Sequence, residues 1–339
     1  MENKKYFSSI DIVKYLCAIM IVDSHVRLIN IENSFLFDLF RFALYFFPCS
    51  YGYFFIKNIK NKKENVLQKS IKRLCIPLLF WAFIYFFINL YNNVLAGNQT
   101  FLAFIEYQFI SMFINGISFH LWFLVAIILN STIVYIAYKN KKIKLLYVIC
   151  IFLYAIGLLG SYYYQIGNSI PIISNLINMK YFTTLCRLIL HGLPTFVMGV
   201  YIEENEEKFS KISNKKLIMF SITTFILCLV EIYCAINYAN IKTNISSLGL
   251  FIFTFVAFIL LKNNPMNKYE NIAKPLKYIS TFMYYSHPLF RTVLASLLMR
   301  LFSIELNSLV MSIVVVVLCT IGGFILYKIN NKQINRICS

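Results

Sequence analysis

Apolar runs separated by short polar or basic tracts make up most of the chain. About ten of these runs reach the length of roughly 20 residues that a helix needs to cross the hydrocarbon core of a bilayer. The predicted spans are residues 10–29, 36–56, 74–94, 119–138, 145–162, 184–202, 217–238, 247–261, 277–297 and 308–327. Between them, residues 95–118 predict an amphipathic helix along the membrane surface, and residues 163–183 predict an irregular loop. The pattern indicates an all-α, polytopic membrane helical bundle that forms a single domain over residues 1–339.

Lysine and arginine are concentrated in every second interval between the runs. With the N-terminus on the inside, 25 of the 32 basic residues fall in inner tails and loops. Basic residues prefer the cytoplasmic side of a membrane, so we predict that both termini are cytoplasmic. The other basic residues lie outside or in the outer halves of spans, and they are Arg27, Arg41, Lys180, Arg187, Lys242, Arg291 and Arg300.

The composition agrees with a membrane protein and argues against a nucleic-acid partner. Hydrophobic residues make up 59% of the chain and charged residues 14%, whereas soluble domains carry ~25% charged residues. The net charge of +18 is split among short tracts, so it predicts topology rather than a continuous nucleic-acid-binding surface. The nine cysteines are scattered without a CxxC pair and predict packing residues.

Four ionisable residues interrupt the first predicted span: Asp11, Lys14, Asp23 and His25. At about 100° and 1.5 Å per residue, Lys14 and His25 share one helix face, about 16 Å apart. Because ionisable groups inside a span are costly, we interpret them as functional. The alternative is that His25 is solvated at the outer interface and that Lys14 extends to the headgroups.

All four histidines, His25, His120, His191 and His287, fall in the outer halves of predicted spans. This placement predicts a cleft open to the outside, where imidazoles can be solvated and exchange protons. No two histidines have the i, i+3 or i, i+4 spacing of a metal-ligand motif, so we predict no metal site.

Three further patterns surround these histidines. Arg187 and His191 are four residues apart, and a sunken arginine needs either an anionic ligand or a partner such as Glu231. His120 is followed by Trp122, a residue type that commonly anchors the outer interface.

Tyr284, His287 and Arg291 form a stripe on one helix face, and Pro288 removes a backbone hydrogen bond beside it. Such a stripe can line a pocket or seal a helix contact.

Lys69, Lys72 and Arg73 precede the third predicted span on the inner side. Alone they indicate topology. Together with Lys14 they form a candidate site for the phosphates of a nucleotide-bearing donor.

These motifs resemble the integral-membrane acyltransferase family 3. The first similar feature is a basic residue and a histidine with ten residues between them, matched by Lys14 and His25. The others, in chain order, are the cluster of Lys69, Lys72 and Arg73, HLWFL at 120–124, the run from Arg187 to Gly199, and the pattern from Ser280 to Pro288. Lysines stand where arginine is commoner in the first two motifs. A lysine lacks the planar fork that binds phosphate through two parallel hydrogen bonds.

The resemblance implies an O-acetyltransferase-like enzyme of the cell membrane, in a bacterium the cytoplasmic membrane. Such an enzyme moves an acyl group, commonly acetyl, from cytoplasmic acyl-CoA to a hydroxyl of an extracytoplasmic glycan, lipid or other acceptor. It implies that Lys14, Lys69, Lys72 and Arg73 hold the donor's phosphates and that His25 is the general base or a transient acyl carrier. The implied acceptor side comprises His120, Trp122, Arg187, His191 and His287.

A permease or binding module for a small polar solute, such as an amino acid, is the alternative. The same family fold forms the membrane half of vancomycin-resistance serine racemases. This chain ends at Ser339 without an attached racemase domain, which favours the enzyme.

Overall fold

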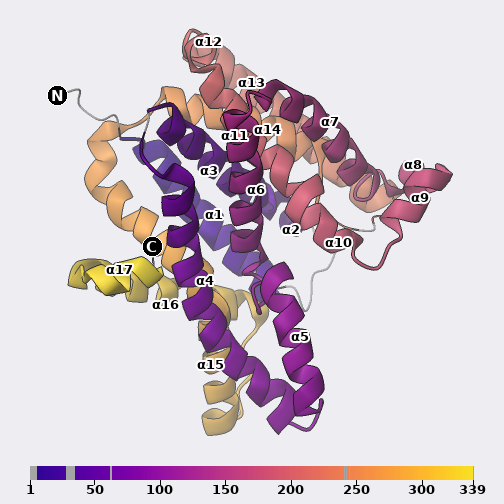
Figure 1. Ribbon diagram of the computed structural model, residues 1–339. Helices are drawn as coiled ribbons and strands as arrows, with labels where there is room; N and C mark the ends of the chain where they lie inside the picture. The colour runs from indigo at the N-terminus through magenta and orange to yellow at the C-terminus, as the bar shows by residue number, and fades with distance from the viewer. Residues whose placement is uncertain are drawn as a thin grey trace.

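The computed structural model describes residues 6–27, 35–61, 63–239, 241, 243 and 245–338, and every regular element in these ranges is a helix (Figure 1). The α-helices are α1 (Ser8–Arg27), α2 (Phe35–Phe40), α3 (Phe42–Lys60), α4 (Val66–Leu90), α5 (Phe101–Ile114), α6 (Trp122–Lys139), α7 (Ile143–Leu159), α8 (Tyr164–Ser169), α9 (Pro171–Ile177), α10 (Phe182–Leu185), α11 (Gly192–Glu204), α12 (Glu206–Ser210), α13 (Asn214–Tyr238), α14 (Leu248–Asn263), α15 (Glu270–Phe302), α16 (Ser308–Ile329) and α17 (Lys332–Cys338). Two π-helical turns, η1 (Tyr91–Leu95) and η2 (Cys186–Leu190), and one 3₁₀ turn, η3 (Asn267–Tyr269), complete the described elements.

The prediction of an all-α membrane bundle is confirmed, with fewer clear spans than expected. Each predicted run overlaps one or more helical elements, but the count of ten is not confirmed, because six helical segments in the described chain are long and apolar enough to cross a membrane. A seventh arises if α14 and the segment Asn267–Phe302, which are bent by 86°, count as one span. The helix α1 is not among them because it carries Asp11, Lys14, Asp23 and Arg27, and α7 has only 17 residues.

Glycines bring α3 and α11 into close contact at the centre of the bundle. A Cβ added at Gly52 would lie 2.0 Å from the Phe196 carbonyl oxygen, and one at Gly199 would lie 1.9 Å from that of Cys49. Small residues at helix contacts let two backbones approach in this way, which strengthens packing inside a membrane. This pair forms the base on which α6, α7 and α14 pack.

The helix α1 packs mainly against α15 and α16, and Figure 1 shows it in the middle of the bundle, behind α4 and α6. Ala18 and Val22 of α1 are fully buried against Met283 of α15 and Cys319 of α16. Asp23 also faces α16, where its carboxylate accepts a 2.8 Å hydrogen bond from the Ser312 hydroxyl. These contacts fix the rotation of α1 and therefore the direction of His25.

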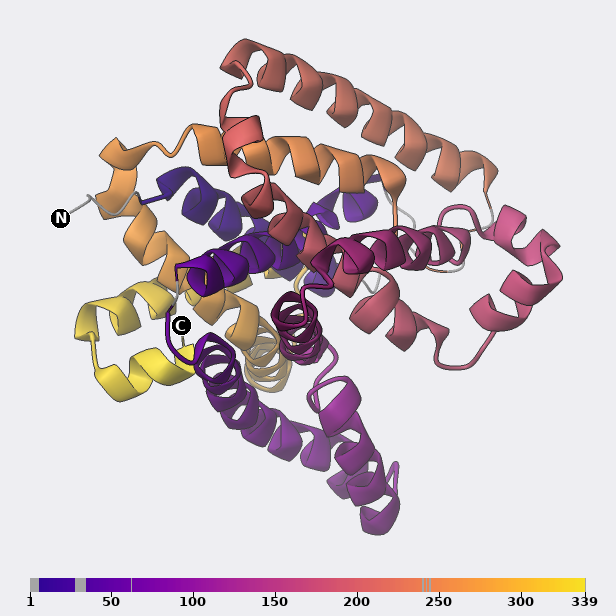
Figure 2. The same ribbon diagram turned by 45° about the horizontal axis from the view of Figure 1, so that its top comes forward.

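The predictions for the two long intervals between spans, residues 95–118 and 163–183, compare differently with the structure. The helix predicted within 95–118 is present as α5, and both views show it projecting from the bundle beside the end of α4 (Figures 1 and 2). The irregular loop predicted for 163–183 is wrong, because this interval holds the short helices α8 and α9. Pro171 is the first residue of α9, a position where its fixed φ and missing N–H are compatible with a helix.

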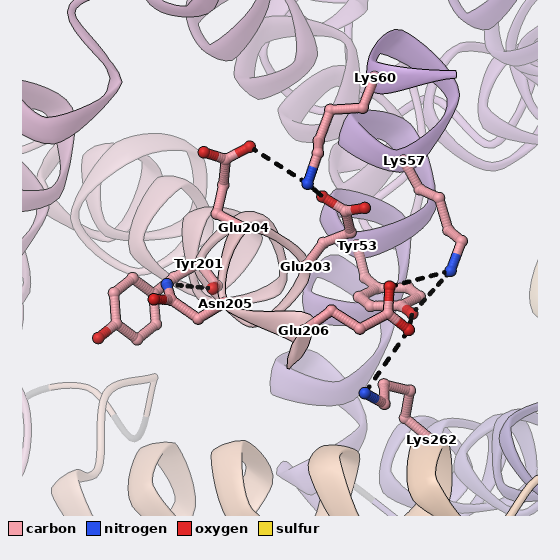
Figure 3. A network of polar contacts seen from close by, with 9 residues as sticks. All are labelled: Tyr53, Lys57, Lys60, Tyr201, Glu203, Glu204, Asn205, Glu206 and Lys262. Carbon is pink, nitrogen blue, oxygen red and sulfur yellow. Dashed lines mark hydrogen bonds and ion pairs between the residues drawn. The ribbon is translucent and has the colours of Figure 1, made fainter. Parts of the chain in front are cut away.

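A network of charges ties α3, α11, α12 and α14 together at one end of the bundle (Figure 3). Glu206 lies 3.2 Å from the Lys57 ammonium and 3.6 Å from that of Lys262, and it accepts a 3.1 Å hydrogen bond from the Tyr53 hydroxyl. Lys60 pairs with Glu203 at 3.0 Å. Burial acts to raise the pKa of Glu206, but the positive charges of Lys57 and Lys262 outweigh it and hold that pKa below its ordinary value.

Candidate active site

Three of the four histidines meet in one cluster. The rings of His25 in α1 and His287 in α15 are stacked, with centroids 5.3 Å apart and planes 11° apart. The ring of His120, which lies just before α6, meets His287 edge-on at 5.2 Å. The sequence predicted that these residues share the outer half of the bundle, and the structure brings their rings into contact.

Hydrogen bonds set the orientation of two of these rings. The Nδ1 of His287 lies 3.0 Å from the carbonyl oxygens of both Met283 and Tyr284, so this nitrogen carries the hydrogen and donates. The Nδ1 of His120 lies 3.0 Å from the Ser118 hydroxyl. The remaining nitrogens, Nε2 of His287 and of His120, have no hydrogen-bond partner among the described residues, and the same is true of His25 Nδ1.

His25 is the member of the cluster that reaches a cavity. A cavity of about 320 Å³ lies beside α1, α2 and η2. Its polar lining residues are Ser24, His25, Arg41, Thr183, Arg187 and Thr243. His120 and His287 are each only 1% exposed and lie behind His25. A ligand in the cavity therefore meets His25 first, while the other two histidines support it.

The predicted stripe on α15 forms a helix contact and does not line this cavity. The Tyr284 hydroxyl donates to the backbone carbonyl of His120, and the Arg291 guanidinium donates to that of His25 at 3.4 Å. His287 completes the contact through its stacked ring. The stripe thus joins α15 to both of the other histidine-bearing segments.

Arg187 and Trp122 lie together at the cavity, with the guanidinium carbon 5.6 Å from the indole centroid. The ion pair with Glu231 that the sequence left open does not form. The Glu231 carboxylate accepts hydrogen bonds from the Ser247 hydroxyl at 2.6 Å and from the backbone N–H groups of Leu248 and Gly249 at 2.9 and 2.6 Å. It satisfies the first N–H groups of α14, which have no partner within the helix.

His191 does not join the cavity, contrary to the prediction that it shares a face with Arg187. The two residues lie at and just after the π-turn η2, in which the N–H of His191 bonds the carbonyl of Cys186, five residues earlier, at 2.8 Å. Of the two, Arg187 alone lines the cavity. The His191 ring is fully buried against Tyr45, with centroids 4.5 Å apart, and its Nε2 lies 3.4 Å from the Leu44 carbonyl oxygen.

At the other end of the bundle, the predicted phosphate-binding residues line a second, larger cavity. Lys69, Lys72 and Arg73 of α4 face a volume of about 670 Å³. Two residues that sequence reasoning missed, Lys332 and Arg336 of α17, face the same volume. No acidic side chain in the described ranges lines it, so its walls are strongly positive. We call these five side chains the basic pocket.

The short helix α17 is held in place by its first residues and by α4. Asn330 adopts a left-handed conformation with φ of 49° and ends α16. The side chain of Asn331 then accepts hydrogen bonds from the N–H groups of Gln333 and Ile334 at 2.8 and 3.3 Å, which caps α17. The Trp81 indole of α4 donates to the Ile337 carbonyl at 3.0 Å. The Asn–Asn pair was the sequence signal for this reversal, which Figure 2 shows in yellow.

Lys14 is near the basic pocket but does not line it. Its ammonium pairs with Asp11 at 3.4 Å and lies 5.2 Å from the centroid of the Phe54 ring. The positive charges of Lys277 and Arg73 act on it, which places it towards the same end of the bundle as the pocket. The helix α1 therefore carries Lys14 towards one site and His25 into the other. Within the described residues, no group of three His, Cys, Asp or Glu side chains is arranged to hold a metal ion.

Comparison with known proteins identifies the family. The family model described as "Acyltransferase domain" matches residues 7–328. Two curated relatives are both named amino-acid racemase and both come from Enterococcus faecalis. One is 25% identical over 341 residues, an alignment that covers 96% of this chain and 46% of the relative. The other is 26% identical over 218 residues, which cover 62% of this chain and 30% of the relative.

The chain thus spans less than half the length of the curated relatives it matches. No solved structure matches it. With a family model that covers nearly the whole chain and a multi-helix membrane fold, the chain belongs to the integral-membrane acyltransferase family 3.

Proposed function

We propose that the protein transfers an acyl group, acetyl in the simplest case, from cytoplasmic acyl-CoA to a hydroxyl of an extracytoplasmic acceptor such as a cell-envelope glycan. One observation carries this proposal. The basic pocket lies at α4 and α17 and the histidine-lined cavity lies beside α1, α2 and η2, while α1 carries Lys14 towards the pocket and His25 into the cavity. A donor with a phosphate-rich head and a long flexible arm fits this separation, because Lys14 and His25 are about 16 Å apart along α1.

The basic pocket binds the phosphates of the donor. Arg73 and Arg336 each offer a planar guanidinium that can form two parallel hydrogen bonds with a phosphate. Lys69, Lys72 and Lys332 add compact positive charges. With no acidic side chain among the described lining residues, nothing in the pocket competes for these cations. We assign Lys14, which pairs with Asp11 and does not line the pocket, to the arm of the donor.

His25 acts as the general base. It takes the proton of the acceptor hydroxyl as the oxygen attacks the thioester carbonyl. The new C–O bond forms, the C–S bond breaks, and the proton passes from His25 to the departing thiolate. Atoms and charge balance without a metal or redox partner. Transient acylation of His25 is the alternative role, and it would leave a covalent intermediate to detect.

His287 and His120 position His25. The stacked ring of His287 fixes one face of the His25 imidazole, and Arg291 holds the backbone carbonyl of His25. A base held in one orientation needs no rearrangement when the hydroxyl arrives. No carboxylate among the described residues lines the cavity, so we assign the orientation of His25 to the stacked ring of His287 and the Arg291 contact with its backbone.

The test uses the full chain in liposomes, with acetyl-labelled CoA outside and a sugar acceptor such as D-glucuronate or D-glucose inside. The wild type should release free CoA and form a labelled ester. His25→Ala should lower the rate by about 10²–10⁴-fold, the usual contribution of a general base, with unchanged CoA affinity. His191→Gln is the matched control, since His191 is buried away from the cavity, and it should keep the wild-type rate.

Two results would reject this assignment. Labelled ester formed at the wild-type rate by His25→Ala would remove His25 from the chemistry. Uptake of an amino acid into the liposomes without consumption of the thioester would favour the permease instead.

A further inference from the structure

The cavity beside His25 carries an uncompensated positive charge. Arg41 and Arg187 both line it, and no acidic side chain does so within the described parts of the chain. Arg41 is neutralised locally, because its Nε lies 3.4 Å from the buried carboxylate of Asp38. Arg187 has no carboxylate within 4.0 Å among the described residues, although Arg41 is close enough for its charge to act on it.

The contacts of Arg187 leave its hydrogen-bonding groups unused. Its guanidinium packs on the Trp122 ring, which satisfies one face of the cation. It donates no hydrogen bond to any residue that the structure describes, and Glu231 is fully engaged by α14. A guanidinium offers five N–H donors in a plane that match the two oxygens of a carboxylate or a phosphate.

Arg187 and His25 face the same small space. A cavity of about 320 Å³ is near the lower end of the range for ligand sites, ~300–1,000 Å³. Because both side chains line this cavity, a single acceptor molecule can place an anionic group against Arg187 and a hydroxyl against His25. Thr183 adds a hydroxyl group to the lining, whereas the Thr243 hydroxyl already donates to the Gly160 carbonyl at 3.2 Å.

We propose that the acceptor carries an anionic oxyacid group, a carboxylate or a phosphate, which Arg187 binds while the acceptor hydroxyl faces His25. This inference names the substrate class of the proposed acyltransferase. Binding of an anion by Arg187 does not depend on the proposed function, whereas the identification of that anion as the acceptor does. The structural alternative is that Arg187 merely holds Trp122 in place. That alternative predicts no preference between a charged ligand and its neutral counterpart.

The experiment measures ligand binding by the purified full chain in detergent, without any acyl transfer. The probes are matched pairs at constant ionic strength: D-glucuronate against D-glucose, and glycerol 3-phosphate against glycerol. At least one acid should raise the melting temperature and give a calorimetric isotherm, and its neutral counterpart should do neither. A response to glucuronate alone identifies a carboxylate site, and a response to glycerol 3-phosphate alone identifies a phosphate site.

Variants separate this cavity from the basic pocket. Arg187→Gln should weaken binding of the acid by about tenfold or more, and Arg187→Lys, which keeps the charge but not the fork, should weaken it less. CoA binding should survive both substitutions. Arg73→Gln should show the opposite pattern, with weaker CoA binding and unchanged acid binding. Arg300→Gln removes an arginine that bonds Tyr91 far from the cavity and should change neither.

Three results overturn the inference: no response to either acid, equal responses to acid and neutral counterpart, or full acid binding by a folded Arg187→Gln protein. Acid binding together with a failure of CoA to bind would leave the inference standing and reject the proposed donor instead.

Discussion

Pro288 and His287 act as a pair at the residue scale. A proline has no N–H, so the Tyr284 carbonyl four residues earlier loses its usual backbone donor. The Nδ1 of His287 takes that place at 3.0 Å and is thereby fixed as the protonated nitrogen. The unprotonated Nε2 is left within the cluster. The proline thus selects the tautomer of the ring that stacks on His25.

Pro288→Ala tests this pairing. The substitution supplies a backbone N–H that competes for the Tyr284 carbonyl, so His287 loses part of its orientation. We expect kcat to fall by about tenfold, the equivalent of one hydrogen bond of ~1.4 kcal/mol, with an unchanged KM for the donor. Pro275→Ala, at the other proline inside α15, is the control and should leave kcat unchanged. Equal losses in both variants would indicate a general effect on the helix.

At the element scale, the apolar runs located the long helices because length and hydropathy decide which segments can cross a membrane. The π-turn η2 was not predictable, because its register depends on packing. A Cβ at Gly192 would lie 2.4 Å from the Arg187 carbonyl oxygen, so only glycine permits this close turn. The spacing of Arg187 and His191 therefore could not predict that only Arg187 of the two lines the cavity.

The packing of α17 against α4 also could not be predicted from the sequence, since a short charged segment has no apolar periodicity of its own. Asn331→Ala removes the cap of α17 and should cost about 0.5–2 kcal/mol of helix stability. Lys332 and Arg336 then leave the basic pocket. We expect the KM for acyl-CoA to rise several-fold while kcat stays constant.

Asn307 caps α16 in the same way, because its side chain accepts a 2.9 Å hydrogen bond from the Leu309 N–H. Asn307→Ala removes this cap. This control should leave the KM for acyl-CoA unchanged. A similar rise in both variants would show that loss of any cap perturbs the donor site.

For the whole molecule, helix geometry and the positive-inside bias predicted two sites at opposite ends but could not predict which side chains meet. His25, His120 and His287 were placed at one depth by sequence, whereas the exclusion of His191 depends on the contacts of η2 and α11. Likewise, the basic cluster before the third span was visible, but its completion by α17 is a tertiary contact. The depth of a side chain in the membrane follows from its position along its own span. Which other side chains it contacts at that depth depends on how the helices pack.

The charge network of Figure 3 joins helices that are distant in the sequence, and its stability should depend on pH. The pKa of Glu206 is lowered in the folded protein, so its contribution is fully present above the unfolded value of about 4.5 and is lost as pH falls through the folded value. Because Glu206 is partly exposed, we expect a contribution of about 0–1 kcal/mol.

The melting temperature of the detergent-solubilised protein, measured from pH 7 to acid, checks this expectation. Glu206→Gln should lower it near neutral pH, and the difference from wild type should shrink as the acid range is reached. Glu305→Gln, at an exposed glutamate of the α15–α16 connection, is the control. A difference that grows on acidification would contradict the assigned sign.

The contacts of the histidine cluster also decide when during synthesis the proposed site can form. Its members come from the first helix, the middle of the chain and the last third, and Arg291 contacts the backbone of His25 across 266 positions of sequence. The basic pocket likewise needs α17, at the very end of the described chain. A nascent chain that has inserted only its first helices therefore has neither site. On the proposed mechanism, acyl transfer therefore cannot begin before α15 and α17 are in place.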